Sequence, residues 1–122
     1  MNRTTLIAII IFLAAACPAS AHSWYSNKSD PVYHNSCCGG NDCAMWAIQP
    51  GEISAEANGL RVRLSLERSK MINPHSLLPI DALVIWDRVQ PSEDGNWHIC
   101  IMGAYRGDDR GGIYCLFAPP NG

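Results

Sequence analysis

The cysteine content constrains the fold of this chain more than any other feature. Six of the 122 residues are cysteines, and five of them lie beyond residue 21: Cys37, Cys38, Cys43, Cys100 and Cys115. Several cysteines in a short exported chain indicate a disulfide framework. Because five is an odd number, two disulfides leave one cysteine over, and the sequence leaves the pairing open.

Residues 1–21 have the order of a secretory signal. Arg3 precedes an unbroken run of 11 apolar residues, Leu6–Ala16, and Ala19–Ala21 offers a small-x-small cleavage pattern. The run is shorter than the roughly 20 apolar residues that span a bilayer. We therefore expect cleavage after residue 21, a single small domain over residues 22–122, and a periplasmic or secreted bacterial protein.

Two other fates of the leader stay open. Cys17 follows three alanines, which is close to a lipoprotein cleavage box, although Leu13 lies four residues before it and Pro18 follows directly. Lipid attachment at Cys17 and an uncleaved anchor are therefore the alternatives.

The composition of the mature chain limits the kinds of partner that it can bind. Its 101 residues are enough for one domain. With Arg3 removed, 8 basic residues stand against 11 acidic ones, a formal charge of −3. No basic run indicates nucleic acid or an anionic membrane, and no second apolar run predicts a membrane span.

The residue pattern predicts a mainly β fold, a small antiparallel sheet or barrel behind an irregular N-terminal segment. Residues 22–42 are rich in Asn, Ser, Gly, Pro and Asp, which indicates loops tied down by cysteines. Beyond them, turn-forming clusters separate short apolar or alternating segments. We expect strands over 44–49, 83–89, 97–102 and 113–117, and a loop or short helical turn over 67–79.

An Asn-Gly pair at 58–59 predicts a β-hairpin. A type I′ turn needs positive φ at both central positions, which Asn-Gly accepts. A two-residue loop would pair Ala57 with Leu60 and Ile53 with Leu64, so that the apolar side chains share one face.

Histidines near the cysteines suggest a metal site as one hypothesis. His34 precedes Cys37 by three residues, and His98 and Cys100 alternate along one expected strand, so they share a face. Zinc and copper both accept Cys and His. The spacing matches no zinc-finger template, and the structural alternative is a disulfide at Cys100 beside a half-buried His98.

His22 would be the first residue after cleavage. Its free α-amino group and imidazole could then chelate copper, with a second imidazole from His34, His75 or His98. Such a set resembles the histidine brace of lytic polysaccharide monooxygenases and of small periplasmic copper carriers. Trp24 follows closely, and we expect it to pack the terminal segment onto the sheet; an exposed recognition spot is the alternative.

No catalytic motif is present in the sequence. It contains no C-x-x-C redox motif and no G-x-S-x-G nucleophile elbow. We therefore expect a binding or structural protein of the cell envelope without catalysis of its own. Its partner would be an envelope protein, and the alternative is a periplasmic metal-binding protein that holds copper ahead of zinc.

The cysteine spacing also resembles a family. The pattern joins His22-Ser23-Trp24-Tyr25, Cys37-Cys38, Asp42-Cys43, Gly95 to Cys100, and Cys115 to Pro120. It is similar to a family of small, exported, uncharacterised bacterial proteins, mostly alphaproteobacterial. The resemblance implies bacterial export and a shared cysteine framework, and it implies no activity.

Overall fold

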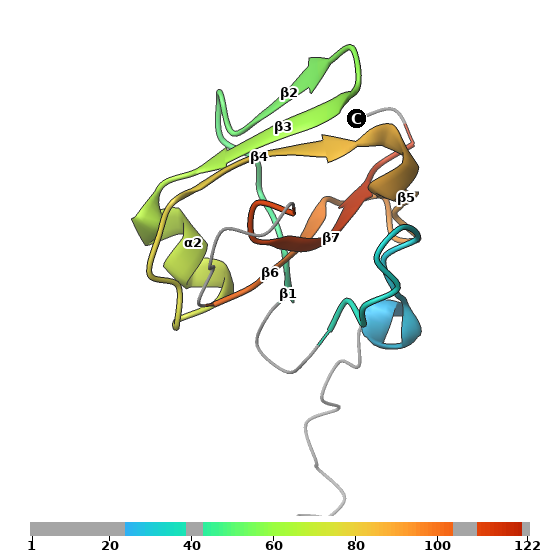
Figure 1. Cartoon of the computed structure of the whole chain (residues 1–122), viewed down its shortest axis with the longest axis horizontal. Coiled ribbons are helices and arrows are strands. Elements are labelled where there is room, and N and C mark those ends of the chain that lie inside the picture. The colour runs from blue at the N-terminus through green and yellow to red at the C-terminus, as the bar shows by residue number, and fades with distance from the viewer. Residues whose placement is uncertain (1–23, 39–42, 104–109, 121–122) are drawn as a thin grey trace, which may run out of the picture.

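The chain folds into two β-sheets that lie one over the other (Figure 1). The structure, a computed structural model, describes residues 24–38, 43–103 and 110–120. One sheet has the strand order β1-β6-β7-β5 and the other β2-β3-β4. The elements are η1 (Trp24–Asn27), β1 (Cys43–Met45), β2 (Ile53–Glu56), β3 (Gly59–Leu64), α2 (Leu66–Ile72), β4 (Ile80–Ile85), η2 (Trp86–Arg88), β5 (Val89–Pro91), β6 (His98–Ile101) and β7 (Ile113–Ala118).

The prediction of a mainly β, disulfide-stabilised fold is confirmed. The strands form two open sheets and not a closed barrel, and one pair departs from antiparallel order because β5 runs parallel to β7. Among the described residues, no helix has the length and apolar character needed to cross a membrane.

The main core lies between the two sheets. Alternate side chains of β3 and β4 meet those of β6 and β7, and α2 and the segment after β1 close the ends. The buried members are Trp46, Leu60, Val62, Leu64, Ile72, Ile80, Ala82, Val84, Ile99, Ile101, Ile113 and Leu116.

The N-terminal segment covers the far face of the four-stranded sheet. Tyr25 and Cys37 form a second buried cluster with Cys100, Cys115 and Phe117. Strand β6 is therefore buried on both faces, and all four of its residues are buried. The expectation that His98 would be half-buried is wrong for this reason.

The hairpin of β2 and β3 forms with a register two residues away from the predicted one. Ile53 pairs with Val62, and Glu56 pairs with Gly59. Gly59 belongs to β3 because it also pairs with β4, where any side chain on it would collide with the carbonyl of Val84. Because side chains alternate between the two faces of a strand, a shift of two residues leaves every side chain on its predicted face. The hairpin therefore forms with its predicted apolar face.

The predicted type I′ turn is wrong. In the described ranges, the only residue other than glycine with a positive φ is His34. Trp86 holds the turn instead: its indole Nε1–H donates to the Ala57 carbonyl at 3.0 Å, and its backbone N–H donates to the Asn58 carbonyl at 3.1 Å.

One expected strand is divided in the structure. The stretch 83–89 belongs to β4, η2 and β5 in turn, because there the chain leaves one sheet and enters the other. The stretch 67–79, expected to be a loop or a short helical turn, begins in the short helix α2, which Ser65 caps by accepting a hydrogen bond from the Arg68 N–H.

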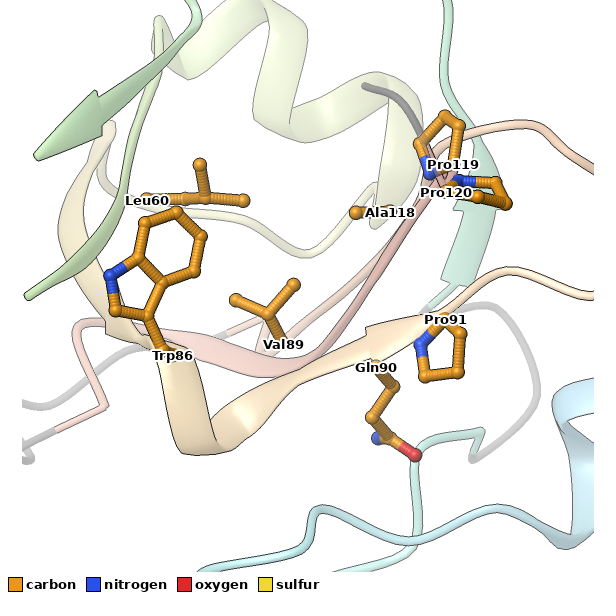
Figure 2. Close-up of a pocket in the computed structure, with 8 residues that line it drawn as sticks. All are labelled: Leu60, Trp86, Val89, Gln90, Pro91, Ala118, Pro119 and Pro120. Atoms are coloured by element: carbon orange, nitrogen blue, oxygen red, sulfur yellow. The ribbon is translucent and has the colours of Figure 1, made fainter.

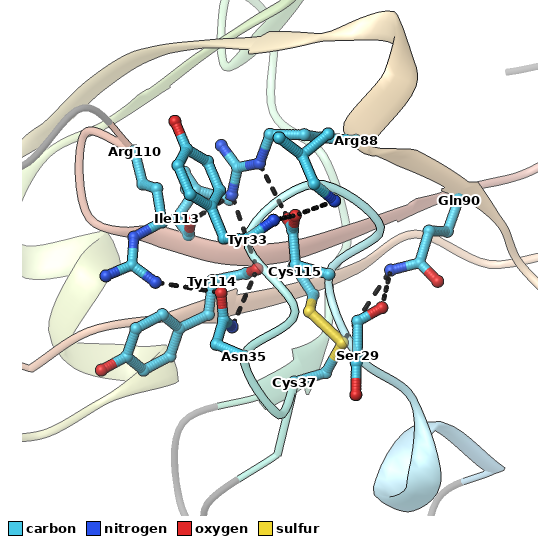
Figure 3. Close-up of polar contacts among 12 residues, drawn as sticks. Ser29, Tyr33, Asn35, Cys37, Arg88, Gln90, Arg110, Ile113, Tyr114 and Cys115 are labelled. Carbon is cyan, nitrogen blue, oxygen red and sulfur yellow. Dashed lines mark hydrogen bonds and ion pairs between the residues drawn. A yellow bond between two sulfur atoms is a disulfide. The ribbon is translucent and has the colours of Figure 1, made fainter.

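A buried ion pair attaches the N-terminal segment to the sheet (Figure 3). The Arg88 Nε lies 2.8 Å from an Asp30 carboxylate oxygen, and the two side chains are 3% and 0% exposed. The other Asp30 oxygen accepts the backbone N–H groups of Val32 and Tyr33. The Arg88 guanidinium also donates to the Ile113 carbonyl at 2.6 Å, so one side chain joins the segment to β7.

Two disulfides reinforce the four-stranded sheet and its cover. Cys37 bonds to Cys115 across a separation of 78 residues, and Cys43 bonds to Cys100 across 57. The first bond joins the N-terminal segment to β7, and the second joins the paired strands β1 and β6, an arrangement among those that the sequence left open. Cys38 takes part in neither disulfide and packs half-buried against the second cluster.

Replacing Asp30 by alanine should lower the free energy of unfolding by about 3–5 kcal/mol, because it leaves the Arg88 charge buried without its partner. Urea denaturation of the oxidised protein measures the loss. Asp87→Ala, at an exposed carboxylate in η2, should change it by less than about 0.5 kcal/mol. Equal losses in the two variants would contradict the anchoring role of Asp30.

Removing the Cys37–Cys115 disulfide in a Cys37→Ser, Cys115→Ser double variant should cost about 4–5 kcal/mol, the chain-entropy value for a loop of this length. The neighbouring Cys38→Ser variant should cost far less, because that side chain closes no loop. Thermal unfolding without reductant compares them, and a larger loss from Cys38→Ser would disprove this ranking.

Candidate functional site

The cysteines gather on one face of the four-stranded sheet. Cys43 of β1 lies opposite Cys100 of β6, which lies opposite Cys115 of β7, so three neighbouring strands each contribute one cysteine at the same level. Cys37 and Cys38 reach this face from the N-terminal segment. The Cys37–Cys115 disulfide therefore bonds that segment to β7, while the Cys43–Cys100 disulfide links β1 to β6 within the sheet.

His98 is a buried histidine with only one of its ring nitrogens paired. Its side chain comes from the first position of β6 and the residue is 4% exposed. The Nε2 atom lies 2.8 Å from both carboxylate oxygens of Asp94. The Nδ1 atom is buried and has no hydrogen-bond partner in the described part of the chain.

Aromatic rings enclose this imidazole. The ring of Trp24 lies edge-on at a centroid distance of 5.1 Å, and that of Tyr25 at 5.0 Å. Phe117 contacts Trp24 at 4.9 Å and completes the group. Trp24 also has a buried indole Nε1 without a partner in the described residues. The prediction that Trp24 packs the terminal segment onto the sheet is confirmed.

Asp94 holds the imidazole from a tight polar turn. Its Oδ1 accepts hydrogen bonds from the Ser92 hydroxyl at 2.8 Å and from the Asn96 N–H at 3.0 Å. The hydrogen bond from His98 is the main cause that holds the pKa of the Asp94 carboxyl well below its ordinary value of 3.8, and the Asn96 and Ser92 bonds act in the same direction. Asp94 is therefore an ionised acceptor at neutral pH.

The predicted metal ligands are not brought together as a set. Within the ranges described, no three His, Cys, Asp or Glu side chains are placed to hold a metal ion. Cys100 is in a disulfide, so the prediction that its thiolate binds metal is wrong. His34 is exposed in a turn with φ 61°, and His22 lies outside the described residues.

An open pocket lined mostly by apolar side chains lies between β3 of one sheet and β5 and β7 of the other, and its volume is about 360 Å³ (Figure 2). Leu60, Val89 and Ala118 form its base, and the indole of Trp86, which is 48% exposed, forms one wall. Three prolines form the opposite wall: Pro91, Pro119 and Pro120.

The polar residue at this pocket points away from it. In Figure 2 the Gln90 side chain leaves the pocket, and its Nε2 donates to the Ser29 carbonyl at 3.2 Å. The Trp86 N–H is also occupied, by the Ala57 carbonyl. Apart from Gln90, the side chains that line the pocket are apolar, which suits an apolar group of a ligand.

The outer edge of β5 beside the pocket cannot pair with another strand. The N–H of Val89 bonds to the Trp86 carbonyl, and Pro91 has no N–H. The Ser92 N–H faces β7, where it donates to Ala118. Added β-strands need free donors at the edge, so recognition at this place depends on side chains.

Sequence reasoning missed three parts of these sites. The i, i+4 spacing of Asp94 and His98 is visible in the sequence, but it does not show that the carboxylate pairs with the imidazole. Nothing in the sequence predicted that Trp86 lines a pocket or that Arg88 pairs with Asp30, because both contacts depend on β5 joining β7. Comparison with known proteins found no family model, curated protein or solved structure that matches the chain.

Asp94→Asn should remove a contribution to stability that depends on acid pH. Because folding lowers the pKa of Asp94, the ionised carboxylate stabilises the folded state above about pH 5, and this contribution is lost as the pH falls below about 4. The difference in unfolding free energy between wild type and variant should therefore shrink as the pH is lowered.

Denaturant unfolding at about pH 6, 4 and 2.5 measures this difference. Asp87→Asn, which changes an exposed carboxylate, is the matched control. A difference for Asp94→Asn that grows toward acid pH would have the wrong sign for this linkage.

Proposed function

We propose that this chain is an exported, disulfide-stabilised binding protein of the cell envelope, periplasmic or secreted, which holds a protein partner and has no catalysis of its own. The leader pattern and the cysteine framework support export. The apolar pocket beside Trp86 is the observation that carries the binding role.

The pocket has the physical character of a protein–protein hot spot. Tryptophan is enriched among the residues that dominate binding energy, and such residues surround apolar anchors of the partner. The Trp86 ring is fixed by its bond to Ala57, and proline rings have little freedom to lose. Rigid walls lower the entropic cost of binding, so even a small pocket can hold an aliphatic or aromatic side chain of an envelope protein.

A photo-crosslinking side chain in place of Pro120, at the pocket rim, tests this function in cells that export the protein. We expect one discrete covalent adduct with an envelope protein. Trp86→Ala should remove most of it, because loss of a hot-spot residue costs about 2 kcal/mol or more, roughly a 30-fold loss of affinity.

The same photo-crosslinker at Leu77 is the control, since this side chain is 58% exposed and lies outside the pocket. Circular dichroism shows whether Trp86→Ala keeps its fold. Adducts of equal yield at both positions, or an adduct at the rim that survives Trp86→Ala in the folded protein, would refute the pocket as the binding site.

A second candidate function is periplasmic copper binding, with zinc as the less suited ion. One observation favours it: the Nδ1 of His98 is buried and has no hydrogen-bond partner among the described residues. This candidate does not use the Trp86 pocket, so the two functions are tested separately.

A further inference from the structure

We propose that the outer edge of strand β2 is a second part of the binding surface, and that it pairs with an extended segment of the protein partner, which adds one strand to the sheet. The inference deepens the proposed function and rests on it, because an apolar side chain of the same segment occupies the pocket beside Trp86. It names the kind of partner, a segment of protein in the β conformation.

Strand β2 forms one edge of the three-stranded sheet and leaves backbone groups unpaired there (Figure 1). The Arg63 N–H donates to the Glu52 carbonyl at 2.7 Å. Ile53 lies opposite Val62, so this bond joins the residue pair just before it. Antiparallel strands bond at every second residue pair, and the N–H and C=O groups of Ile53 and Ala55 therefore point away from β3. Within the described part of the chain these four groups have no partner.

The unpaired groups are complementary to another extended chain. Outward positions of a strand are two residues apart, about 6.8 Å, and each carries one donor and one acceptor. A second extended backbone repeats the same groups at the same spacing, whereas a helix uses its own N–H and C=O groups internally. The edge of β2 therefore fits a partner segment that is extended and not helical.

The edge of β2 leads into the pocket. Ala55 lies opposite Leu60, and side chains at opposite positions share a face, so the Ala55 methyl group lies beside the base of the pocket. The carbonyl of Ala57, the residue after β2, accepts the indole N–H of Trp86 at 3.0 Å. A large side chain that faces Ala55 from the added strand meets only a methyl group and extends over it toward Leu60.

The other sheet edges are less suited to an added strand. The β5 edge lacks available donors, as described above. Strand β1 has three residues, and the Sγ of Cys43 at its start lies 3.0 Å from the Cys37 carbonyl oxygen of the N-terminal segment. On β4 the inward side chains of Ala82 and Val84 are buried, whereas Ala55 is exposed. Room for a further inward side chain is therefore present beside β2.

The partner segment has a defined residue pattern. Its side chains alternate between the two faces, with an aromatic or long aliphatic residue facing Ala55. On the other face, polar residues lie beside Ser54 and Glu56, which are both exposed. Proline is excluded at the positions whose N–H donates to the carbonyls of Ile53 and Ala55.

The decisive experiment uses the full chain with the photo-crosslinking side chain at Pro120, in cells that export it. Ala55→Pro removes an outward N–H and no bond within the sheet, and proline is accepted at such edge positions. Leu83→Pro is the matched control, because it removes an outward N–H from β4, the opposite edge of the same sheet. Circular dichroism and thermal unfolding show whether each variant folds.

Ala55→Pro should lower the yield of the adduct at least about tenfold, while Leu83→Pro stays within about twofold, because only the first removes a hydrogen bond to the partner and blocks its approach. If the protein with an unchanged β2 gives no adduct, the proposed function itself fails. If it gives the adduct and folded Ala55→Pro matches its yield, only the pairing at β2 is overturned. Equal losses in the two folded variants also overturn the pairing.

Amide hydrogen exchange in the purified adduct tests the pairing even if Ala55→Pro does not fold. The N–H groups of Ile53 and Ala55 should exchange at least about tenfold more slowly in the adduct than in the unlinked protein, because a hydrogen-bonded amide is protected. The outward N–H of Leu83 should exchange equally in both. Unchanged exchange at Ile53 and Ala55 overturns the pairing and leaves the pocket as the binding site.

Discussion

The buried ion pair between Asp30 and Arg88 is the interaction on which the rest of the structure depends. It fixes the turn after Asp30 through two backbone N–H bonds and fixes β7 through the carbonyl of Ile113. Neither charge has access to water, so each needs the other to remain buried. The N-terminal segment is thereby held in one position, and the Cys37–Cys115 disulfide can close beside it.

That position turns a two-layer protein into one with three layers. The four-stranded sheet carries the main core on one face and the aromatic and cysteine cluster on the other. A histidine on a half-exposed strand would pair with water, whereas His98 packs against Trp24 and Tyr25, and its Nδ1 has no partner in the part of the chain that the structure describes. The copper proposal follows from this burial, and the proposal of a binding protein follows from the opposite situation at Trp86, an apolar surface left open.

Much of the β fold could be predicted from local patterns, and the sites could not. The strands near 97–102 and 113–117 and the hairpin were visible as apolar alternation between turns. The register of the hairpin was not, because Gly59 is drawn into β3 by its pairing with β4, a contact that Asn-Gly preferences do not contain. The bond between Asp94 and His98 could not be predicted either, because it depends on the burial of β6 on both faces.

The sequence by itself determined the β class, the faces of the hairpin and a framework of more than one disulfide, because these depend on residue type and short spacing. Only the tertiary structure decided which cysteines pair, how Asp30 meets Arg88 and where the pocket opens. The residues of the two disulfides and of the ion pair lie from 57 to 78 positions apart along the chain. Their energy comes from burial and charge compensation at the meeting of distant segments, which no local pattern encodes.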